Sequence, residues 1–482
     1  MRSRGLAAGF AGLALSVWLI GCGMLRPDLR ALYDFAPDKA QPPVVVIPGI
    51  LGSRLRRHDG TEIWPGSTWS LLFGHKEQLA LSIDPKTLEP IDDGVEANGL
   101  FESALGNDFY GEILRTLENF GHYERGFPGA PCASIARGDR ERPAKDGDHE
   151  RCKIGRRYYV FAYDWRQDNV ITARKLDALI QQIRRDYGDP DLKVDVIAHS
   201  MGGLVARYYA RYGTEDVLDG NDFHATMAGR KNIRTFILLG TPNLGSAHSL
   251  HGFLVGTRVG LASIPPEVLA TTPSTYELFP HALSDWLLGV DGKPLDRDLF
   301  DVETWQRFQW SVFDPDIEAR VRTRAAQDGS NGDAAVDTLH RYFEKRLERA
   351  RRFVWSLTVP EPEGQSSKLI VLGGDCTLTP ARLVVEEDGG DSVVRLYPED
   401  IKHKVPGVDY ARLMLEPGDG EVTKPSLLLR QELDPTKPRH QFIQVAPAYS
   451  FLLCEDHSRL TSNINFQDNL LNILLSGDRP WD

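Results

Sequence analysis

A short apolar strand leads through a serine-containing turn directly into a helix, and few folds accommodate this sequence. Residues 194–203 read VDVIAHSMGG, in which five strand-forming residues precede His199 and Ser200. The turn matches the pattern G-x-S-x-G, with Ala198 at the first glycine and Gly202 at the second. These two positions must be small, because such a turn is tight and packs closely against its neighbours. We therefore expect Ser200 to present its hydroxyl at the carboxyl end of a sheet, as a nucleophile does.

Apolar runs and helical patterns alternate along most of the chain. The runs are continuous rather than alternating, which is typical of parallel strands covered on both faces. Helical patterns lie at 172–187 and 204–212. The alternation predicts an α/β fold. The expected strands are Val44–Ile47, Tyr158–Ala162, Val194–Ala198, Thr235–Leu239 and Leu369–Leu372.

Residues 54–156 and 246–365 interrupt this alternation. Connections of such length are insertions that usually have a function of their own. The first contains Trp64 and Trp69, which are either ordinary core residues or part of a surface that binds the acyl chain or docks on lipid. We divide the chain into a leader (1–22), a linker (23–42), a first core part (43–245), a cap or lid (246–365) and a second core part (366–482).

The second insertion ends in an amphipathic helix. Apolar residues recur at steps of three and four from Val336 to Leu357, and Asp333 is the expected N-cap. The opposite face is basic and either is solvated or contacts anionic lipid head groups. It carries Arg341, Lys345, Arg346, Arg349 and Arg352.

Composition places the 482-residue chain among globular proteins. Hydrophobic residues make up 41%, which is ample for a core and excludes a disordered chain. The 56 Lys and Arg against 68 Asp and Glu give a net charge of −12. A negatively charged chain repels the negative phosphates of nucleic acids, so we expect no nucleic-acid partner.

The first 22 residues read as an export signal of bacterial type. Arg2 and Arg4 precede an uncharged, mostly apolar segment that ends in Leu-Ile-Gly-Cys. This ending resembles a lipobox, in which Cys22 is lipidated and becomes the mature N-terminus. Several acyl chains hold a protein stably on a bilayer. We expect an exported lipoprotein of the cell envelope, and Gly23 favours the outer membrane.

Export to an oxidising compartment makes disulfides possible for the other cysteines. Closeness in sequence favours Cys132–Cys152 among three pairings, which leaves Cys376–Cys454. No Cys or His spacing is typical of a zinc site, so we expect neither a metal nor another cofactor.

A serine nucleophile needs a base, an acid that orients the base, and donors for the oxyanion. In α/β folds with a nucleophilic serine at such a strand-to-helix turn, the acid and the histidine follow the serine in the chain. His457 is the best placed base, between the apolar stretch Gln441–Ala446 and a helical pattern at Asn463–Leu475. The acid is either Asp375, just after a strand, or Asp419, in a tight Gly-Asp-Gly loop.

Two backbone N–H groups are expected to form the oxyanion hole. One is that of Met201, directly after the nucleophile, and the other comes from the loop after the first strand. In that loop, Pro-Gly-Ile-Leu-Gly at 48–52, we choose Ile50, with Leu51 as the alternative.

Several segments, in this order, resemble the lecithin:cholesterol acyltransferase family. They are VVVIPGILGSRL (44–55), YDWRQDN (163–169), AHSMGGLVARYY (198–209), LLGTPNLGS (238–246), LTPAR (378–382) and GDGEVT (418–423). The resemblance implies an α/β-hydrolase fold whose insertions form cap, lid and membrane-docking regions. It also favours Asp419 as the acid, with Asp375 in reserve, and Ile50 as the oxyanion donor. The family often has Trp-Gly where this chain has Asn243-Leu244.

The resemblance implies a serine-dependent acyl hydrolase or acyltransferase. Such an enzyme cleaves a phospholipid or other acyl-ester lipid through an acyl-serine and passes the acyl group to water or an alcohol. One alternative is a serine esterase that acts on other esters. Another is a surface lipoprotein that uses the fold only for binding.

Overall fold

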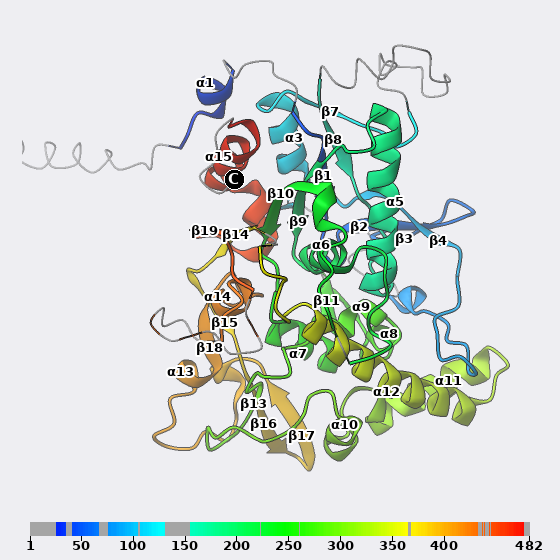
Figure 1. Ribbon diagram of the computed structural model, residues 1–482. Coiled ribbons are helices and arrows are strands. Elements are labelled where there is room, and N and C mark those ends of the chain that lie inside the picture. The colour runs from blue at the N-terminus through cyan, green and yellow to red at the C-terminus, as the bar shows by residue number, and fades with distance from the viewer. Residues whose placement is uncertain are drawn as a thin grey trace, which may run out of the picture.

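The computed structural model describes residues 26–34, 41–66, 76–104, 107–130, 155–221, 223–259, 261–364, 368–431, 436, 438, 443 and 445–476 (Figure 1). The expected leader, Cys22, Trp69, Cys132 and Cys152 lie outside these residues. Within them, no helix is both long and apolar enough to cross a bilayer.

A sheet of seven strands forms the centre of the molecule, and every neighbouring pair in it is parallel. The strand order is β19-β14-β10-β9-β1-β8-β7. The strands are β1 (Val44–Ile47), β7 (Tyr123–Arg125), β8 (Arg156–Val160), β9 (Val194–His199), β10 (Ile233–Leu239), β14 (Leu369–Gly374) and β19 (Tyr449–Leu453). The parallel α/β fold expected from the apolar runs is thus confirmed.

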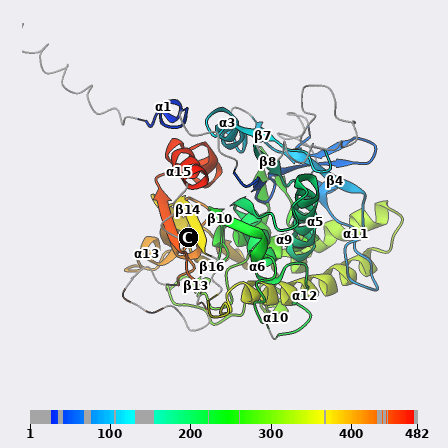
Figure 2. The ribbon, with the colours of Figure 1, turned by 45° about the horizontal axis from the view of Figure 1, so that its top comes forward.

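Helices cover both faces of this sheet (Figure 2). On one face α5 (Asn169–Tyr187) and α6 (Met201–Tyr212) pack against side chains such as Val45 and Val196. On the other face α3 (Gly111–Asn119) and α15 (Ile464–Leu475) pack against the alternate side chains of the same strands. Burial on both sides explains why β1, β9 and β10 read as continuous apolar runs.

Helix α5 shows how local sequence sets the ends of an element. The Asp168 carboxylate accepts a hydrogen bond from the Val170 N–H at 2.9 Å and so caps the first turn. Gly188 has a φ of 61° and ends the helix in the left-handed conformation. The helix therefore begins a few residues before the apolar pattern does.

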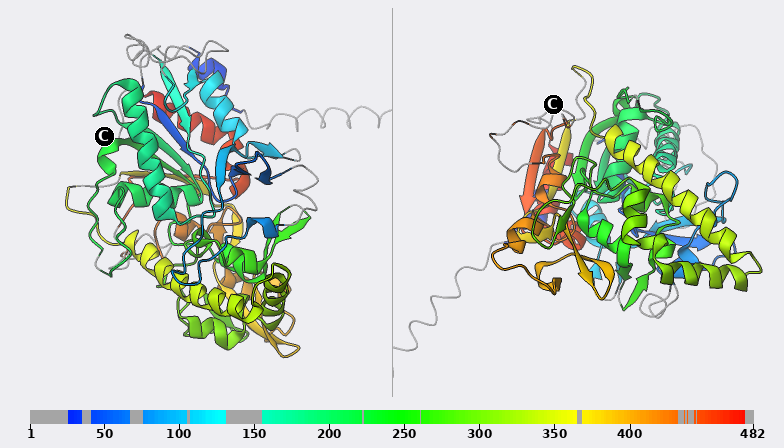
Figure 3. Two further views of the ribbon diagram at one scale, coloured as in Figure 1. Left: turned by 90° about the vertical axis from the view of Figure 1, so that its right-hand side faces the viewer. Right: turned by 90° about the horizontal axis from the view of Figure 1, so that it is seen from below.

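The two long intervals contain small sheets and helices of their own (Figure 3). Between β1 and β8 lie β2 (Ser53–Arg57), β3 (Glu62–Trp64), β4 (Val95–Leu100), β5 (Ser103–Ala104), β6 (Asn107–Asp108), α3 and β7. Between β10 and β14 lie α7 (Ala247–Val255), β11 (Thr257–Val259), β12 (Ala262–Ile264), α8 (Pro266–Leu269), α9 (Pro273–Tyr276), β13 (Leu287–Gly289), α10 (Val302–Phe308), α11 (Pro315–Gln327) and α12 (Gly332–Ser356).

After β14 the chain leaves the central sheet once more before it returns as β19. The elements are β15 (Thr377–Pro380), β16 (Leu383–Asp388), β17 (Asp391–Arg395), α13 (Tyr410–Met414), β18 (Leu415–Gly418) and α14 (Lys424–Leu427). Strand β16 pairs with β13 of the preceding interval, so the two segments share a small sheet. Another short helix, α1 (Leu29–Tyr33), precedes β1.

The long helix α12 confirms the predicted amphipathic pattern but not its expected N-cap. The side chain of Asn331 accepts from the Ala334 N–H at 3.0 Å, whereas Asp333 pairs with Arg322. Asparagine caps a helix as well as aspartate does, and the helix simply starts earlier than the apolar pattern suggested.

The basic face of α12 is paired with carboxylates of the same chain. Arg349 contacts both Asp168 and Asp216, and Arg346 is almost completely buried against Glu89. The remaining pairs are Arg341–Asp337, Lys345–Glu89 and Arg352–Glu348. The expectation of a solvated face is therefore wrong for Arg346 and Arg349, whereas Arg341 at the same face stays about half exposed.

Candidate active site

Ser200 lies at the sharp turn between β9 and α6. Its φ of 53° and ψ of −128° are strained values for a residue with a side chain. The backbone is held there because the Ser200 N–H donates to the Leu239 carbonyl at 2.8 Å. A side chain at Gly202 would meet the Pro48 carbonyl at 2.3 Å, so this position must be glycine.

Ser200, His457 and Asp419 form a continuous hydrogen-bonded chain. His457 Nε2 lies 3.0 Å from Ser200 Oγ, and His457 Nδ1 lies 2.8 Å from Asp419 Oδ2. Ser200 and His457 are 257 residues apart in the sequence, and the fold alone brings them together. In this arrangement the imidazole can accept the hydroxyl proton while the carboxylate holds its other nitrogen.

The loop around Asp419 fixes the carboxylate in place. Its Oδ1 accepts hydrogen bonds from the N–H groups of Glu421 and Val422 at 3.1 and 2.7 Å. Its main-chain carbonyl accepts from the His457 N–H at 2.9 Å. Burial favours the neutral acid, but the charge of His457 and these N–H donors outweigh burial and lower the pKa of Asp419.

The same pair sets the protonation of the imidazole. Burial disfavours a charged His457, but the nearby Asp419 carboxylate outweighs it and raises the pKa of His457 to about 9. A raised pKa in the folded state means that the imidazolium stabilises the fold. This contribution is complete below pH about 6.5 and is lost as the pH rises through about 9.

Activity should have the opposite dependence on pH, because only the neutral imidazole can accept the serine proton. We expect kcat/KM for a water-soluble short-chain ester to rise with pH and to level off above about 9. A pH–rate profile of the purified protein measures this, with buffer-matched thermal unfolding as a check on stability. A rate that is already constant from pH 6.5 upward would contradict the raised pKa of His457.

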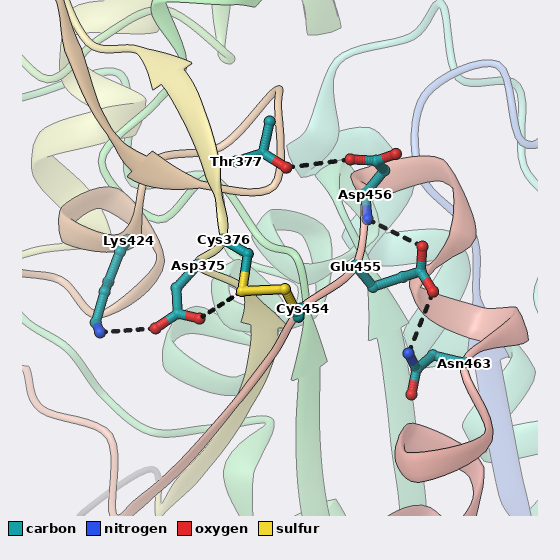
Figure 4. The surroundings of a disulfide bond; sticks show 8 residues. All are labelled: Asp375, Cys376, Thr377, Lys424, Cys454, Glu455, Asp456 and Asn463. Carbon is teal, nitrogen blue, oxygen red and sulfur yellow. Dashed lines mark hydrogen bonds and ion pairs between the residues drawn. A yellow bond between two sulfur atoms is a disulfide. The ribbon is translucent and has the colours of Figure 1, made fainter. Parts of the chain in front are cut away.

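Asp375, the reserve acid, is paired with a lysine, whereas the imidazole is paired with Asp419. The Asp375 carboxylate pairs with Lys424 Nζ at 2.9 Å, beside a disulfide (Figure 4). That disulfide joins Cys376 to Cys454 and confirms one of the two expected pairs. It links the carboxyl ends of β14 and β19, and so ties down the segment that leads into His457.

The strand before His457 differs from the expected one. It is β19 (Tyr449–Leu453), an edge strand that is largely exposed in its first half, rather than the apolar stretch Gln441–Ala446. Of that stretch the structure describes Ile443, Val445 and Ala446, and none of them is in a strand.

The loop after β1 lies beside Ser200. A side chain at Gly49 would place its Cβ 2.7 Å from the Ser200 Cβ, so glycine is required for this close approach. Ile50 follows directly in this loop, and Met201 is the first residue of α6, whose N–H has no acceptor within the helix. Leu51 has a φ of 61° and its carbonyl accepts from the Trp64 indole at 2.8 Å.

A cavity of about 970 Å³ opens onto Ser200 and His457. Much of its wall is apolar, and Trp64 stacks edge to face on Trp165 with ring centroids 5.7 Å apart. Trp64 therefore lies in the wall of the cavity rather than on an exposed docking surface. The other apolar wall residues include Ile50, Leu51, Phe101, Phe109, Phe253, Leu269 and Leu278.

Polar groups gather in one part of the same cavity. His248 lies 3.7 Å from Glu421, and burial together with His248 lowers the pKa of His251 to about 4. Both histidines are on α7, and Arg258 on β11 also lines the cavity. Nothing in the described part of the chain gathers three or more histidine, cysteine or acidic side chains into a metal site.

The Asp-Trp-Arg segment after β8 braces this wall from behind. The buried Arg166 guanidinium pairs with Asp164 and Asp93, each at 2.8 Å. Trp165, between them, turns its ring into the cavity wall. The segment thus has a structural role behind the cavity wall.

Comparison with known proteins supports the fold and the class of chemistry. The family model described as lecithin:cholesterol acyltransferase matches residues 155–312, which confirms the resemblance over that segment. The segment contains Ser200 and supports lipid-ester hydrolysis or acyl transfer in broad terms. Among curated proteins none matches the chain significantly.

Solved structures include similar folds of low sequence identity. The structure of the Tle4–Tli4 complex aligns with a TM-score of 0.53 at 15% identity, over 91% of this chain and 98% of that one. The mature form of the Bacillus licheniformis lipase BlEst2 aligns with a TM-score of 0.31 at 12% identity, over 91% and 94%. The seven-stranded parallel sheet, the turn at Ser200 and the first of these alignments agree with the expected α/β-hydrolase fold.

Proposed function

We propose that this protein is a serine-dependent lipid acyl hydrolase or acyltransferase that cleaves an ester bond of a phospholipid. The observation that carries the proposal is the hydrogen-bonded chain of Ser200, His457 and Asp419 at a large, mainly apolar cavity. A triad beside such a cavity suits an ester with a long acyl chain.

In the first half of the reaction, His457 takes the hydroxyl proton as Ser200 Oγ attacks the ester carbonyl. Asp419 stabilises the imidazolium, and the N–H groups of Met201 and Ile50 hold the oxyanion. The intermediate then expels the lysolipid alkoxide, which receives the proton from His457. The products of this half are an acyl-serine and a lysolipid.

In the second half, His457 removes a proton from water or from an alcohol, and the resulting oxygen nucleophile attacks the acyl-serine. Collapse of the second intermediate returns the proton to Ser200 and releases a fatty acid or a new ester. Water is the abundant acceptor, so acyl transfer requires that the cavity exclude it.

The apolar wall is the reason to propose a lipid rather than a short ester. Each methylene moved from water into such surroundings contributes about 0.8 kcal/mol. An acyl chain along Trp64, Trp165 and Phe253 therefore gains binding energy that an acetyl group lacks.

Vesicles of acyl-labelled phospholipid test this proposal, with and without a long-chain alcohol as acceptor. We expect labelled fatty acid in both cases, and a labelled ester only with the alcohol, at a rate that Ser200→Ala abolishes. Hydrolysis of short soluble esters without hydrolysis of the vesicle phospholipid would instead favour the alternative function, a serine esterase that acts on other esters. The absence of both activities from a folded protein would favour a binding protein.

We also propose that the chain is an exported lipoprotein, anchored through acyl chains on Cys22 at the outer membrane. The sequence of residues 1–22 supports this proposal. We expect labelling by an alkyne fatty acid in a bacterial host, lost in Cys22→Ser, and co-fractionation with outer membranes. A mature N-terminus other than Cys22, found by mass spectrometry, would contradict the anchor.

A further inference from the structure

We infer that Tyr110 and His199 form a positioning pair that sets the separation between the two halves of the oxyanion hole. The inference rests on the proposed function of Ser200. Tyr110 is the residue before α3, far from Ser200 in the sequence, and no motif pointed to it. It is 4% exposed and lines the cavity together with His199.

The Tyr110 hydroxyl bridges two loops. It accepts a hydrogen bond from the Gly49 N–H at 2.8 Å, and it lies 2.8 Å from His199 Nδ1. Gly49 directly precedes Ile50, and His199 directly precedes Ser200 and Met201. One hydroxyl thus connects the residues next to both proposed oxyanion donors.

Both groups of the bridge are uncharged. Burial, and then the nearby His457, lower the pKa of His199 to about 3, so its ring is neutral at working pH. Burial raises the pKa of Tyr110, so its hydroxyl keeps its proton. The Gly49 N–H donates to the Tyr110 hydroxyl, and the neutral hydroxyl and the neutral imidazole share the second hydrogen bond at His199 Nδ1.

Other contacts hold the same loop but do not link it to the turn at Ser200. The Tyr163 hydroxyl donates to the Pro48 carbonyl at 2.8 Å, and the Gly52 N–H donates to the Gly49 carbonyl at 3.1 Å. Without Tyr110 the loop keeps these contacts, so we expect it to stay folded while its distance from Met201 becomes less well defined.

Tyr110→Phe tests the inference, because it removes the hydroxyl and keeps the ring. We expect kcat for vesicle or short-chain ester hydrolysis to fall about 10- to 100-fold with KM nearly unchanged. Binding of a long-chain trifluoromethyl ketone, which forms an oxyanion on Ser200, should weaken by a similar factor. Binding of a non-hydrolysable ether analogue of the substrate should not change.

Tyr209→Phe is the matched control. The Tyr209 hydroxyl also makes two hydrogen bonds, a partly buried one to Asp177 at 2.9 Å and a buried one from Asn232 at 2.6 Å, but it does not line the cavity. We expect this variant to lose thermal stability while its kcat and its affinity for the ketone stay unchanged. A general loss of stability would affect both variants alike.

Variants of His199 test the other half of the pair. His199→Asn keeps a hydrogen-bond acceptor near Nδ1 and should retain more kcat than His199→Leu, which has none. Since the two residues share one bond, Tyr110→Phe combined with His199→Leu should cost no more than the larger single effect. The single His199 variants test the same hydrogen bond from its other end, so they replace Tyr110→Phe if that variant does not fold.

Two results would overturn the inference. One is a kcat of Tyr110→Phe within twofold of the unchanged protein, and the other is equal weakening of ketone and ether binding. Both presuppose that the unchanged protein reacts with a fluorophosphonate at Ser200. If it does not react, the proposed function fails and not the role of Tyr110.

Discussion

Replacement of Ser200 by alanine is expected to lower kcat for ester hydrolysis by about 10⁴- to 10⁶-fold. The side chain is the only hydroxyl that the fold brings within hydrogen-bond distance of His457 Nε2 in the described residues, at 3.0 Å. Without it no acyl-enzyme forms, and His457 has no nucleophile to activate. Single-turnover hydrolysis of labelled phospholipid vesicles measures the loss.

Labelling with a fluorophosphonate provides the second readout for Ser200→Ala. The unchanged protein should take up one equivalent, located at Ser200 by peptide mass spectrometry, and the variant none. The thermal unfolding midpoint should change little, because the alanine removes one oxygen atom. Labelling at another serine, or substantial activity in the variant, would place the nucleophile elsewhere.

Replacement of Asp419 by asparagine is expected to lower kcat by about 10³- to 10⁴-fold. The new side chain could still meet His457 Nδ1, but it has no charge to stabilise the imidazolium, and its amide favours the wrong tautomer. Loss of the carboxylate also removes what raises the pKa of His457, so the pH–rate profile should shift to lower pH. Steady-state rates across the pH range measure both effects.

Asp375→Asn is the matched control, since it makes the same chemical change on the other candidate acid. Asp375 pairs with Lys424 at the molecular surface, so the change should alter kcat by less than about threefold. The result that contradicts the assignment is the reverse pattern, in which only Asp375→Asn inactivates the protein.

The centre of the sheet could be predicted from sequence because its strands are buried on both faces. Strand β1 is apolar at every position and has the predicted bounds, and β9 and β10 have two polar residues each. Edge strands lack this signal. Strand β7 reads Tyr-Glu-Arg and β19 is partly exposed, so neither stands out from a loop.

The site could be predicted only in part. The turn at Ser200 has a local sequence signature, because Ala198 is completely buried and a side chain at Gly202 would meet the Pro48 carbonyl. Asp419 has no local sequence signature that separates it from Asp375, because each aspartate follows a strand. Only the family resemblance favoured Asp419 as the acid. Tyr110 has no local signature at all, because its partners Gly49 and His199 meet it only in the folded chain.

The charged face of α12 shows a further limit of sequence patterns. The periodicity located the helix correctly, yet a row of arginines looks the same whether it meets water, lipid or protein. Here the partners are Glu89, Asp168 and Asp216, which come from distant parts of the chain. Pairing of this kind is a property of the fold, and spacing within one helix does not reveal it.

The reacting hydroxyl and its imidazole are 257 residues apart, and this distance has a consequence for biosynthesis. A ribosome completes the Ser200 turn long before it adds the segment that carries the base. During translation the chain thus holds a serine that nothing activates. We expect the nascent protein to be inert toward the lipids of the cell that makes it. It should become reactive only when β19 joins the sheet and brings His457 to Ser200.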